Sequence, residues 1–411
     1  MKSSAFFNTI IIGAGPAGLF AAANLTVNDV MLIEKNKLPG RKLMISGSGQ
    51  CNFTHYGRID DFEEHYGSNS DFVMHALRNF TNENTIHYFK TRGIQILIDK
   101  NGKVFPRSLK AVEVLNILLH EIKKREVELL YEHAVLDVKK SRSHFVVSLN
   151  NCQYTCRHLI ISTGGLSWPQ TGSNGDGYGF ARALGHTIIQ PQPALCPVIP
   201  VAYPFASLSG ISLSRVHLNL YRAGKWIRDY KGDMAFTHTG ITGPAILDFS
   251  RYIHPGDILK INLTGISAEE MEQRFIKQSQ AGGTTLLSFL RNQSVVKNLA
   301  IALLENLQLS RDKPLSEVSA KHRRQLIQSC CAFPFEVNEL AGFKKAMATA
   351  GGVSLNEINP LTMESRLVKN LYFTGEVLDI DGDTGGYNIQ AAFSTAWLAA
   401  QNINMPGKLN L

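Results

Sequence analysis

The stretch Asn8–Glu34 reads NTIIIGAGPAGLFAAANLTVNDVMLIE: an apolar run, a glycine-rich turn, a second apolar run and an acid. Glycines at 13, 15 and 18 match the G-x-G-x-x-G pattern of a strand–turn–helix unit that binds a dinucleotide. In that unit Gly13 permits the tight turn, Gly15 lets backbone approach a pyrophosphate, and Gly18 lets helix and strand pack closely. Glu34 follows Gly13 by 21 positions, near the ~20 expected of the acid that binds a ribose hydroxyl. Because strand, turn, helix and acid fall in register, the stretch predicts dinucleotide binding at the N-terminus.

Length and composition indicate a globular protein of two or three domains, since 411 residues exceed what one simple core supports. Apolar residues make up 44% of the chain and charged residues 18%, as in soluble proteins. The longest apolar stretch, Thr9–Leu25, is interrupted by glycines and a proline, so it predicts buried sheet and helix rather than a membrane span or signal peptide. Six cysteines without metal-ligand spacing indicate reduced thiols and a cytoplasmic protein.

The charge balance points to phosphate-bearing partners. The formal net charge is +8, from 42 Lys and Arg against 34 Asp and Glu. A basic surface attracts the phosphates of a dinucleotide, a nucleic acid or an anionic lipid. A lysine excess kept for solubility gives the same balance, so charge alone leaves nucleic-acid binding open.

Hydrophobic periodicity predicts three parts, of which the first two are discontinuous. Strand and helix patterns alternate near both ends of the chain, whereas short alternating runs such as Val216–Leu220 mark the middle as β-rich. The expected parts are a dinucleotide-binding domain at 1–190 and 345–411, a β-rich substrate domain at 191–266 and 331–344, and a small helical insert at 267–330. A capping box of Ser267 and Glu270 opens the insert, and Gln278–Gly283 is expected to be a loop between helices.

The same periodicity predicts individual elements of the dinucleotide-binding domain. A helix is expected over 111–125, because its leucines and valines recur on one face. Expected strands cover 127–131, 134–138, 145–149, 159–161 and 371–373, and the last helix is expected over 389–401.

Four further glycine-rich blocks have the spacing of a flavoprotein. They read PGRKLMISGSGQCNFT (39–54), STGG (162–165) extended by GDGYG (175–179), FTHTGITGP (236–244), and YFTGEVLD (372–379) followed by GGYNIQ (385–390). With TMES at 362–365, these blocks resemble the BaiN/YhiN-like (RdsA-like) family of NAD(P)/FAD-dependent oxidoreductases over nearly the full chain. The resemblance implies an α/β fold in which a two-dinucleotide-binding-type FAD domain, Rossmann-like, carries an inserted β-rich domain and a small helical subdomain.

The resemblance and the chemistry of each block together assign residues to FAD. The first helix offers unpaired N–H groups to the pyrophosphate, and Glu34 is expected on the adenosine ribose. Related flavoproteins hold the adenine by backbone contact at the place of Val135, and Glu376 resembles an acid that meets the ribityl chain or pyrophosphate. The final helix, opened by Gly386, has N–H groups that can stabilise negative charge on reduced flavin. The expected FAD contacts are Gly13, Gly15, Pro16, Ala17, Gly18, Glu34, Lys35, Arg41, Lys42, Ser46, Gly47, Val135, Thr163, Gly164, Gly165, Gly375, Glu376, Gly386, Tyr387, Asn388 and Ile389.

The chain departs from the family pattern at several positions. Ser48 and Gln50 replace the usual glycine and arginine, and His55 stands where asparagine is common. In the last helix, residues 392–395 replace a stretch that normally contains tryptophan. If the missing arginine normally contacts an anionic substrate or a flavin carbonyl, Gln50 weakens that contact.

Two residues are candidates for proton transfer. Cys51 is the only thiol inside a motif block, so it could donate a proton beside the flavin or pack there as a small buried hydrophobe. His238 lies in a Thr- and Gly-rich loop, where it could serve as a general acid–base or only satisfy backbone groups.

A basic cluster in the helical insert is the candidate RNA contact. It consists of Arg311, Lys321, Arg323 and Arg324. Such a run neutralises phosphates when it binds RNA, and otherwise forms a solvated helix face.

Together these patterns predict an FAD-dependent oxidoreductase in which flavin N5 exchanges a hydride with substrate. No second G-x-G-x-x-G follows a strand, so NAD(P)H is expected to dock transiently over the flavin. The resemblance and the basic insert favour a uridine of ribosomal RNA, reduced to dihydrouridine, as the substrate. Two alternatives stay open: a reductase or oxidase of a small enone or aminoketone, and a non-catalytic flavin-binding RNA or ribosome factor. No membrane partner is expected, and the pattern does not set an oligomeric state.

Overall fold

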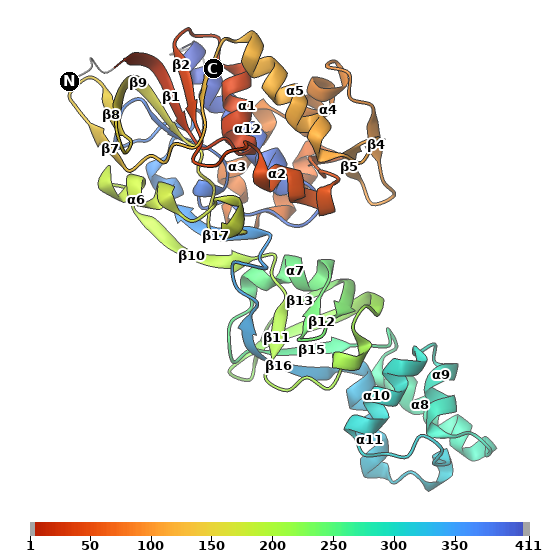
Figure 1. The fold of residues 1–411 in the computed structure, drawn as a ribbon. Coiled ribbons are helices and arrows are strands. Elements are labelled where there is room, and N and C mark those ends of the chain that lie inside the picture. The colour runs from red at the N-terminus through yellow and green to blue at the C-terminus, as the bar shows by residue number, and fades with distance from the viewer. Residues whose placement is uncertain (1–4, 406–411) are drawn as a thin grey trace. The chain divides into compact units, whose positions relative to one another are not determined.

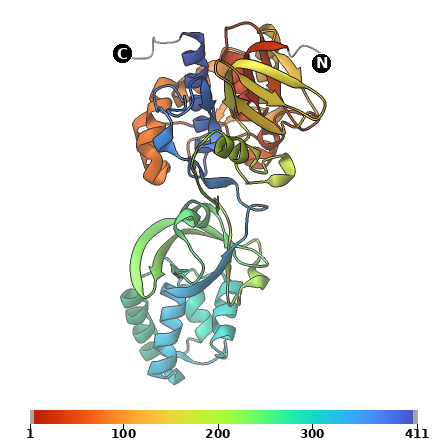
Figure 2. The ribbon, with the colours of Figure 1, turned by 90° about the vertical axis from the view of Figure 1, so that its left-hand side faces the viewer.

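The computed structural model describes residues 5–405, which divide into two compact units (Figures 1 and 2). The terminal unit extends to Ala194 and resumes at Ala346, and the inserted unit is Leu195–Lys345. The expected boundary at 190 cuts a strand, because residues 191–194 belong to β10 (Ile188–Ala194), which pairs with β17 (Ala348–Val353).

A seven-stranded sheet forms the centre of the terminal unit (Figure 1). Its strands are β1 (Phe6–Ile12), β2 (Val30–Ile33), β6 (Glu128–Leu130), β7 (Asp137–Lys140), β8 (Phe145–Ser148), β9 (Gln153–Ile161) and β18 (Leu371–Phe373). The order β6-β2-β1-β9-β18 is parallel, whereas β7 and β8 are antiparallel. The first half of β9 pairs with β8 and its last three residues pair with β18. The strand expected at 159–161 is therefore only the buried end of a longer one, and the strand expected over 134–138 begins only at Asp137.

Helices α1, α5 and α12 pack together beside this sheet (Figure 1). The helices of the unit are α1 (Pro16–Asn24), α2 (Arg41–Ile45), α3 (Ser70–Asn79), α4 (Asn82–Lys90), α5 (Ala111–Lys124), α6 (Asp176–Ala183) and α12 (Tyr387–Asn404). A small sheet of β3 (Thr54–His55), β4 (Ile96–Ile98) and β5 (Lys103–Pro106) completes it. The helix expected over 111–125 is confirmed. The last helix is longer than expected, because it begins directly after Gly386, whose φ of 103° suits only glycine.

The inserted unit is a closed six-stranded barrel with a helical extension. The barrel order is β11 (Val198–Pro200), β14 (Ile241–Thr242), β13 (Lys225–Phe236), β12 (Ser212–Arg222), β15 (Ile258–Asn262) and β16 (Phe333–Leu340). Helix α7 (Pro244–Phe249) packs on β13. The extension holds α8 (Ala268–Ala281), α9 (Leu286–Asn292), α10 (Lys297–Asn306) and α11 (Ala320–Cys331).

The barrel and the helices share one core, so the expected β-rich and helical parts form one unit. Ser267 Oγ accepts the N–H of Glu270 at 3.1 Å, which confirms the predicted helix start. The loop expected at 278–283 is wrong in part, because α8 continues to Ala281 and breaks only at Gly282 and Gly283, both with φ near 73°.

Two further features concern the cysteines and the apolar character of the helices. All six cysteines are free thiols. Across residues 5–405, none of the helices combines the length and the apolar character needed to cross a membrane.

Candidate functional site

Four parallel strands of the terminal unit end side by side. Ile12 on β1 pairs with Ile33 on β2 and with Ile161 on β9, and Ile161 pairs with Phe373 on β18. The residues that follow these strand ends meet at the carboxyl edge of the sheet, where open α/β sheets bind their ligands. They are the fingerprint turn, Glu34, the 163–165 block and the 375–376 block. The fold thus brings together four segments that are far apart in the chain.

The three fingerprint glycines are required for different reasons. Gly13 has φ +101°, and a Cβ there would lie 2.7 Å from the Ser162 carbonyl oxygen. A Cβ on Gly18 would lie 1.9 Å from the carbonyl oxygen of Gly13, so close helix–strand packing excludes any side chain. A Cβ on Gly15 would meet nothing within 4 Å, and its φ of −80° suits any residue. Packing therefore explains Gly13 and Gly18, whereas Gly15 leaves open space in front of the helix.

The start of α1 is suited to an anion. Its N-cap, Gly15, provides no side-chain cap, and Pro16 occupies the first turn. Within residues 5–405, no acceptor binds the N–H groups of Ala17 and Gly18. Uncapped N–H groups and the helix dipole favour a phosphate at this end. The open space at Gly15 and these donors together fit the pyrophosphate of FAD.

Glu34 and Val135 are placed to hold the adenosine part of FAD. Glu34 is 8% exposed; its Oε2 accepts the Ala14 N–H at 2.8 Å, and its Oε1 accepts two bonds from Asn36. A carboxylate has about four acceptor sites, so one remains for a ribose hydroxyl. Val135 lies in the loop between β6 and β7, and neither its N–H nor its C=O has a partner within residues 5–405. Its backbone is thus free to pair with a base edge.

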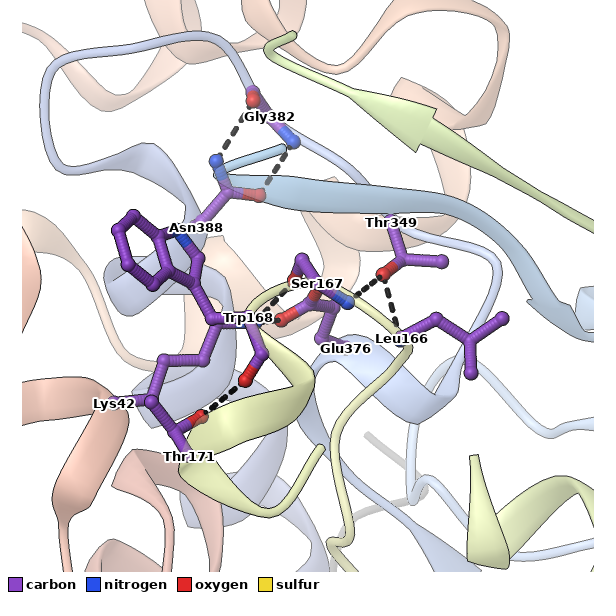
Figure 3. Close-up of polar contacts among 9 residues, drawn as sticks. All are labelled: Lys42, Leu166, Ser167, Trp168, Thr171, Thr349, Glu376, Gly382 and Asn388. Carbon is purple, nitrogen blue, oxygen red and sulfur yellow. Dashed lines mark hydrogen bonds and ion pairs between the residues drawn. The ribbon is translucent and has the colours of Figure 1, made fainter. Parts of the chain in front are cut away.

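A partly buried polar triad ties three segments together at this edge (Figure 3). Lys42 on α2 contacts both Ser167, in the loop after β9, and Glu376, after β18, and Ser167 Oγ donates to Glu376. Ser167 is fully buried, and its N–H and that of Leu166 donate to Thr349 Oγ1 at 3.0 and 2.9 Å. Lys42 and Glu376 therefore neutralise each other and fix the loops. Ser167 and Thr349 were not predicted, since only their tertiary neighbours reveal a role.

Replacing Glu376 with alanine is expected to lower the free energy of unfolding by roughly 1–3 kcal/mol, because a charge-assisted bond is lost and Lys42 stays charged and poorly solvated. Urea denaturation of the apoprotein measures this loss. Removing both charges, with Lys42→Met and Glu376→Gln, should cost less than the two single changes added together. Strict additivity of the two changes would show that the pair is not coupled.

The start of α12 forms a second feature of the site, built on glycine and aromatic contacts. A Cβ on Gly386 would lie 2.5 Å from the Thr54 carbonyl oxygen, so this backbone approaches β3 closely. Tyr387 is sandwiched between the rings of His55 and His65, with centroids 5.0 and 4.0 Å away. His65 Nδ1 lies 2.9 Å from Asp383 Oδ2. The sequence did not single out the His65–Asp383 pair, because 318 residues separate its members.

His55, which stands where asparagine is common in the family, contacts the glycine loop before α12. Its Nδ1 lies 3.1 Å from the Gly385 carbonyl oxygen, in addition to stacking on Tyr387. Burial lowers the pKa of His55, so its ring is neutral at neutral pH. The histidine therefore braces the glycine loop before α12. Asn388 braces the same loop, since its side chain exchanges two hydrogen bonds with Gly382, at 2.9 and 2.7 Å (Figure 3).

The remaining predicted FAD residues lie in the terminal unit, and several of their polar groups bind protein atoms. Lys35 pairs with Asp176, Arg41 donates to Asn36 at 2.9 Å, and Ser46 Oγ donates to Leu43 at 2.7 Å. Gly47, Gly164 and Gly375 have positive φ, Gly165 packs on Thr349, and Ile389 lies half-buried in the first turn of α12. Thr163 Oγ1 is buried without a hydrogen-bond partner within residues 5–405, as a group awaiting a ligand would be.

The two proton-transfer candidates lie in different units and differ in exposure. Cys51 is fully buried in the core of the terminal unit, and burial raises its pKa to about 12 although a hydrogen bond with Ser46 opposes this. A thiol with such a pKa stays protonated and inert. His238 is exposed at the tip of a turn between β13 and β14 in the inserted unit. The proton-donor role of each stays a prediction, and burial favours the small-hydrophobe alternative for Cys51.

Comparison with known proteins adds the family. A family model described as the HI0933-like protein Rossmann domain matches residues 7–402. The chain belongs to the HI0933-like family. The chain is also similar to the ribosomal RNA dihydrouridine synthase of Escherichia coli (strain K12), 33% identical over 405 residues that cover 97% of this chain and 98% of that protein. The 3-dehydro-bile acid delta(4,6)-reductase of Clostridium scindens is 30% identical over 406 residues, covering 95% and 97%.

Solved structures show the same fold at low identity. A flavocytochrome c3 fumarate reductase in its open conformation has a TM-score of 0.54 at 13% identity, covering 98% of this chain and 79% of that one. The 3-ketosteroid-delta4-(5alpha)-dehydrogenase of Rhodococcus jostii RHA1 has a TM-score of 0.50 at 12% identity, covering 96% and 97%. The predicted Rossmann-like fold is confirmed. As a member of the HI0933-like family, the chain is an FAD-dependent oxidoreductase, the enzyme class that its motifs predict.

Proposed function

We propose that this enzyme reduces the C5–C6 double bond of a uridine in ribosomal RNA, with NAD(P)H as the electron donor. The observation that carries the proposal is the 33% identity, over 97% of the chain, to a protein named ribosomal RNA dihydrouridine synthase. A second such protein, from Haemophilus influenzae, is equally similar over 98% of the chain. The net charge of +8 supports a polyanionic substrate.

The terminal unit supplies binding and orientation for this reaction. Bound FAD would supply hydride chemistry, which no side chain can provide. The start of α1 would hold the pyrophosphate, while Glu34 and the Val135 backbone would hold the adenosine. The start of α12, at Gly386, would stabilise negative charge near the ring system through its helix dipole. A uridine must leave its stack to reach such a site.

Reduction of the uracil double bond also requires a proton at the carbon that does not receive the hydride. His238 is the better of the two predicted donors, because its imidazole is exposed whereas the Cys51 thiol is buried. Cys51 is a weak acid in its buried position, with its pKa raised to about 12.

A second candidate function is reduction of a small conjugated enone. The 30% identity to a 3-dehydro-bile acid delta(4,6)-reductase favours it. The bond chemistry is similar, because the C5–C6 bond of uracil is also conjugated to a carbonyl. The chemistry at the flavin site therefore does not separate the two candidate substrates. A measurement of binding to a polyanion such as RNA separates them better.

The test maps dihydrouridine in ribosomal RNA by mass spectrometry in a deletion strain, before and after the gene is restored. We expect one dihydrouridine to disappear on deletion and to return with the gene. Purified protein with NADPH or NADH should restore it in ribosomal RNA from the deletion strain. Unchanged RNA, together with turnover of a small enone, would overturn the proposal.

A further inference from the structure

The basic cluster expected to contact RNA is partly neutralised within the protein. Arg323 Nε lies 2.7 Å from Glu272 Oε1, and Arg311 lies 3.7 Å from Asp312. Only Lys321 and Arg324 of the cluster are exposed without an ion pair within residues 5–405. Two isolated cations are a weak basis for RNA binding, and another surface of the inserted unit offers groups for both phosphates and bases.

Strands β13, β12 and β15 are neighbours in the barrel (Figure 1), and their outer face combines aromatic and basic residues. Along β12, Val216, Leu218 and Leu220 are buried inside the barrel. Side chains alternate between the two faces of a strand, so His217, Asn219 and Tyr221 face outward. Directly opposite on β15 are Asn262, Lys260 and Ile258, and on β13 Lys231, Asp229 and Trp226. Residues that pair directly across strands share a face, so these nine form one outward surface, termed here the barrel face.

Two aromatic side chains of the barrel face pair across neighbouring strands: Trp226 is open to solvent, and Tyr221 is half-buried. Trp226 is 56% exposed, although a tryptophan normally buries most of its area. Its Nε1 donates to Asn219 Oδ1 at 3.4 Å, which keeps the indole on this face. Tyr221 pairs with Trp226 across the strands, and the Lys260 ammonium lies 4.4 Å from the centre of the Tyr221 ring. An exposed indole, a half-buried phenol ring and a cation therefore share one patch of the barrel face.

The three strands also carry a positive charge excess. They contain six Lys and Arg residues against two aspartates and no glutamate. Both aspartates are engaged: Asp229 contacts His217 at 2.8 Å, and Asp233 accepts the N–H of Arg215 at 2.9 Å. Within residues 5–405, Lys225 and Lys231 are exposed and have no acidic partner, so cations rather than anions are available to a ligand.

We propose that the barrel face binds an unpaired segment of RNA, stacking bases on Trp226 and Tyr221 while Lys231 and Lys260 contact phosphates. Aromatic rings in a basic sheet surface are how single-stranded nucleic acids are held, because every base has a π-face and every phosphate a charge. The proposal rests on RNA being the substrate and names the surface that holds it outside the flavin site. A uridine in an unpaired segment is also the one that leaves its stack at least cost.

The test measures binding of a mixed-sequence single-stranded RNA, with a duplex of the same sequence as control. Trp226→Ala should weaken single-strand binding roughly 5- to 150-fold, the range of one lost base stack, and leave duplex binding nearly unchanged. Trp226→Phe should restore most of the affinity, because a phenyl ring still stacks. Phe6→Ala is the matched control: Phe6 is 61% exposed at the amino end of β1, in the terminal unit.

Charge gives an independent measurement. Lys260→Gln should reduce the slope of log affinity against log salt by about one, whereas Lys321→Gln in the helical insert should leave it unchanged. Bound FAD and circular dichroism should match the wild type in all variants.

Three outcomes would overturn the proposal. In the first, wild type binds the RNA and Trp226→Ala binds it equally well. In the second, only Lys321→Gln alters the salt slope. In the third, Trp226→Ala changes the mass of the protein assembly measured by sedimentation but leaves RNA affinity unchanged. That result would identify the barrel face as a protein–protein interface. None of these results contradicts the proposed function, because that function has its own test. It is contradicted if the dihydrouridine content of ribosomal RNA is the same in the deletion strain.

Discussion

Replacing His238 with alanine is expected to lower turnover by roughly 10²–10⁴-fold, while FAD content and reduction of the flavin by NAD(P)H stay as in wild type. The expectation follows from the turn that carries His238. Tyr203 donates to the carbonyl oxygens of Thr237 and Gly240 at 2.9 and 2.6 Å, and the Thr237 N–H donates to Gly240 at 2.8 Å. A tightly bonded turn thus presents an exposed imidazole with no hydrogen-bond partner within residues 5–405. Such a side chain is free to exchange a proton with a substrate.

Cys51→Ala is the matched comparison. Because Cys51 is buried and its thiol is a weak acid, its loss should change turnover little and stability by about 1 kcal/mol. Stopped-flow kinetics separates the two half-reactions, with NADPH first and substrate second. If added imidazole restores the substrate half-reaction of His238→Ala, the lost group is a proton donor. A full-rate His238→Ala variant with a slow Cys51→Ala variant would reverse the assignment.

Replacing Gly15 with alanine is expected to reduce FAD affinity roughly 10- to 150-fold, the effect of losing one charge-assisted hydrogen bond, without destabilising the apoprotein. A Cβ at this position meets no protein atom within 4 Å, so the apoprotein has no reason to change. The methyl group would instead occupy the space that a pyrophosphate needs to reach the N–H groups of Ala17 and Gly18. FAD content from the visible spectrum and thermal unfolding of the apoprotein measure the two effects separately.

Gly18→Ala should behave in the opposite way. Its Cβ would lie 1.9 Å from the Gly13 carbonyl oxygen, so helix α1 must move off the sheet at a cost of roughly 1–3 kcal/mol or more. We therefore expect a lower melting temperature for the apoprotein itself. Equal destabilisation by both substitutions would contradict the idea that Gly15 is reserved for a ligand.

The sequence by itself determined the features that depend on local geometry. The Asn8–Glu34 stretch specified strand, turn, helix and acid, because the positive φ of Gly13 and the close approach of Gly18 to the Gly13 carbonyl are set within a few residues. Ser267 likewise marked the start of α8, since a cap needs only the N–H three residues later. The family and the enzyme class followed from the order of the glycine blocks.

Only the tertiary structure decided which distant residues meet. Ser167 contacts both Lys42 and Glu376, which are 334 positions apart in the chain. The stack of His55, Tyr387 and His65 forms because β3 lies against the start of α12. The sequence predicts an RNA contact or a solvated helix face at the basic cluster of the insert, yet Arg323 is paired with Glu272, and exposed Trp226 lies with basic residues on the barrel. The physical reason is that burial, ion pairing and the face to which a strand residue points all depend on what packs against it, and a linear pattern does not contain those neighbours.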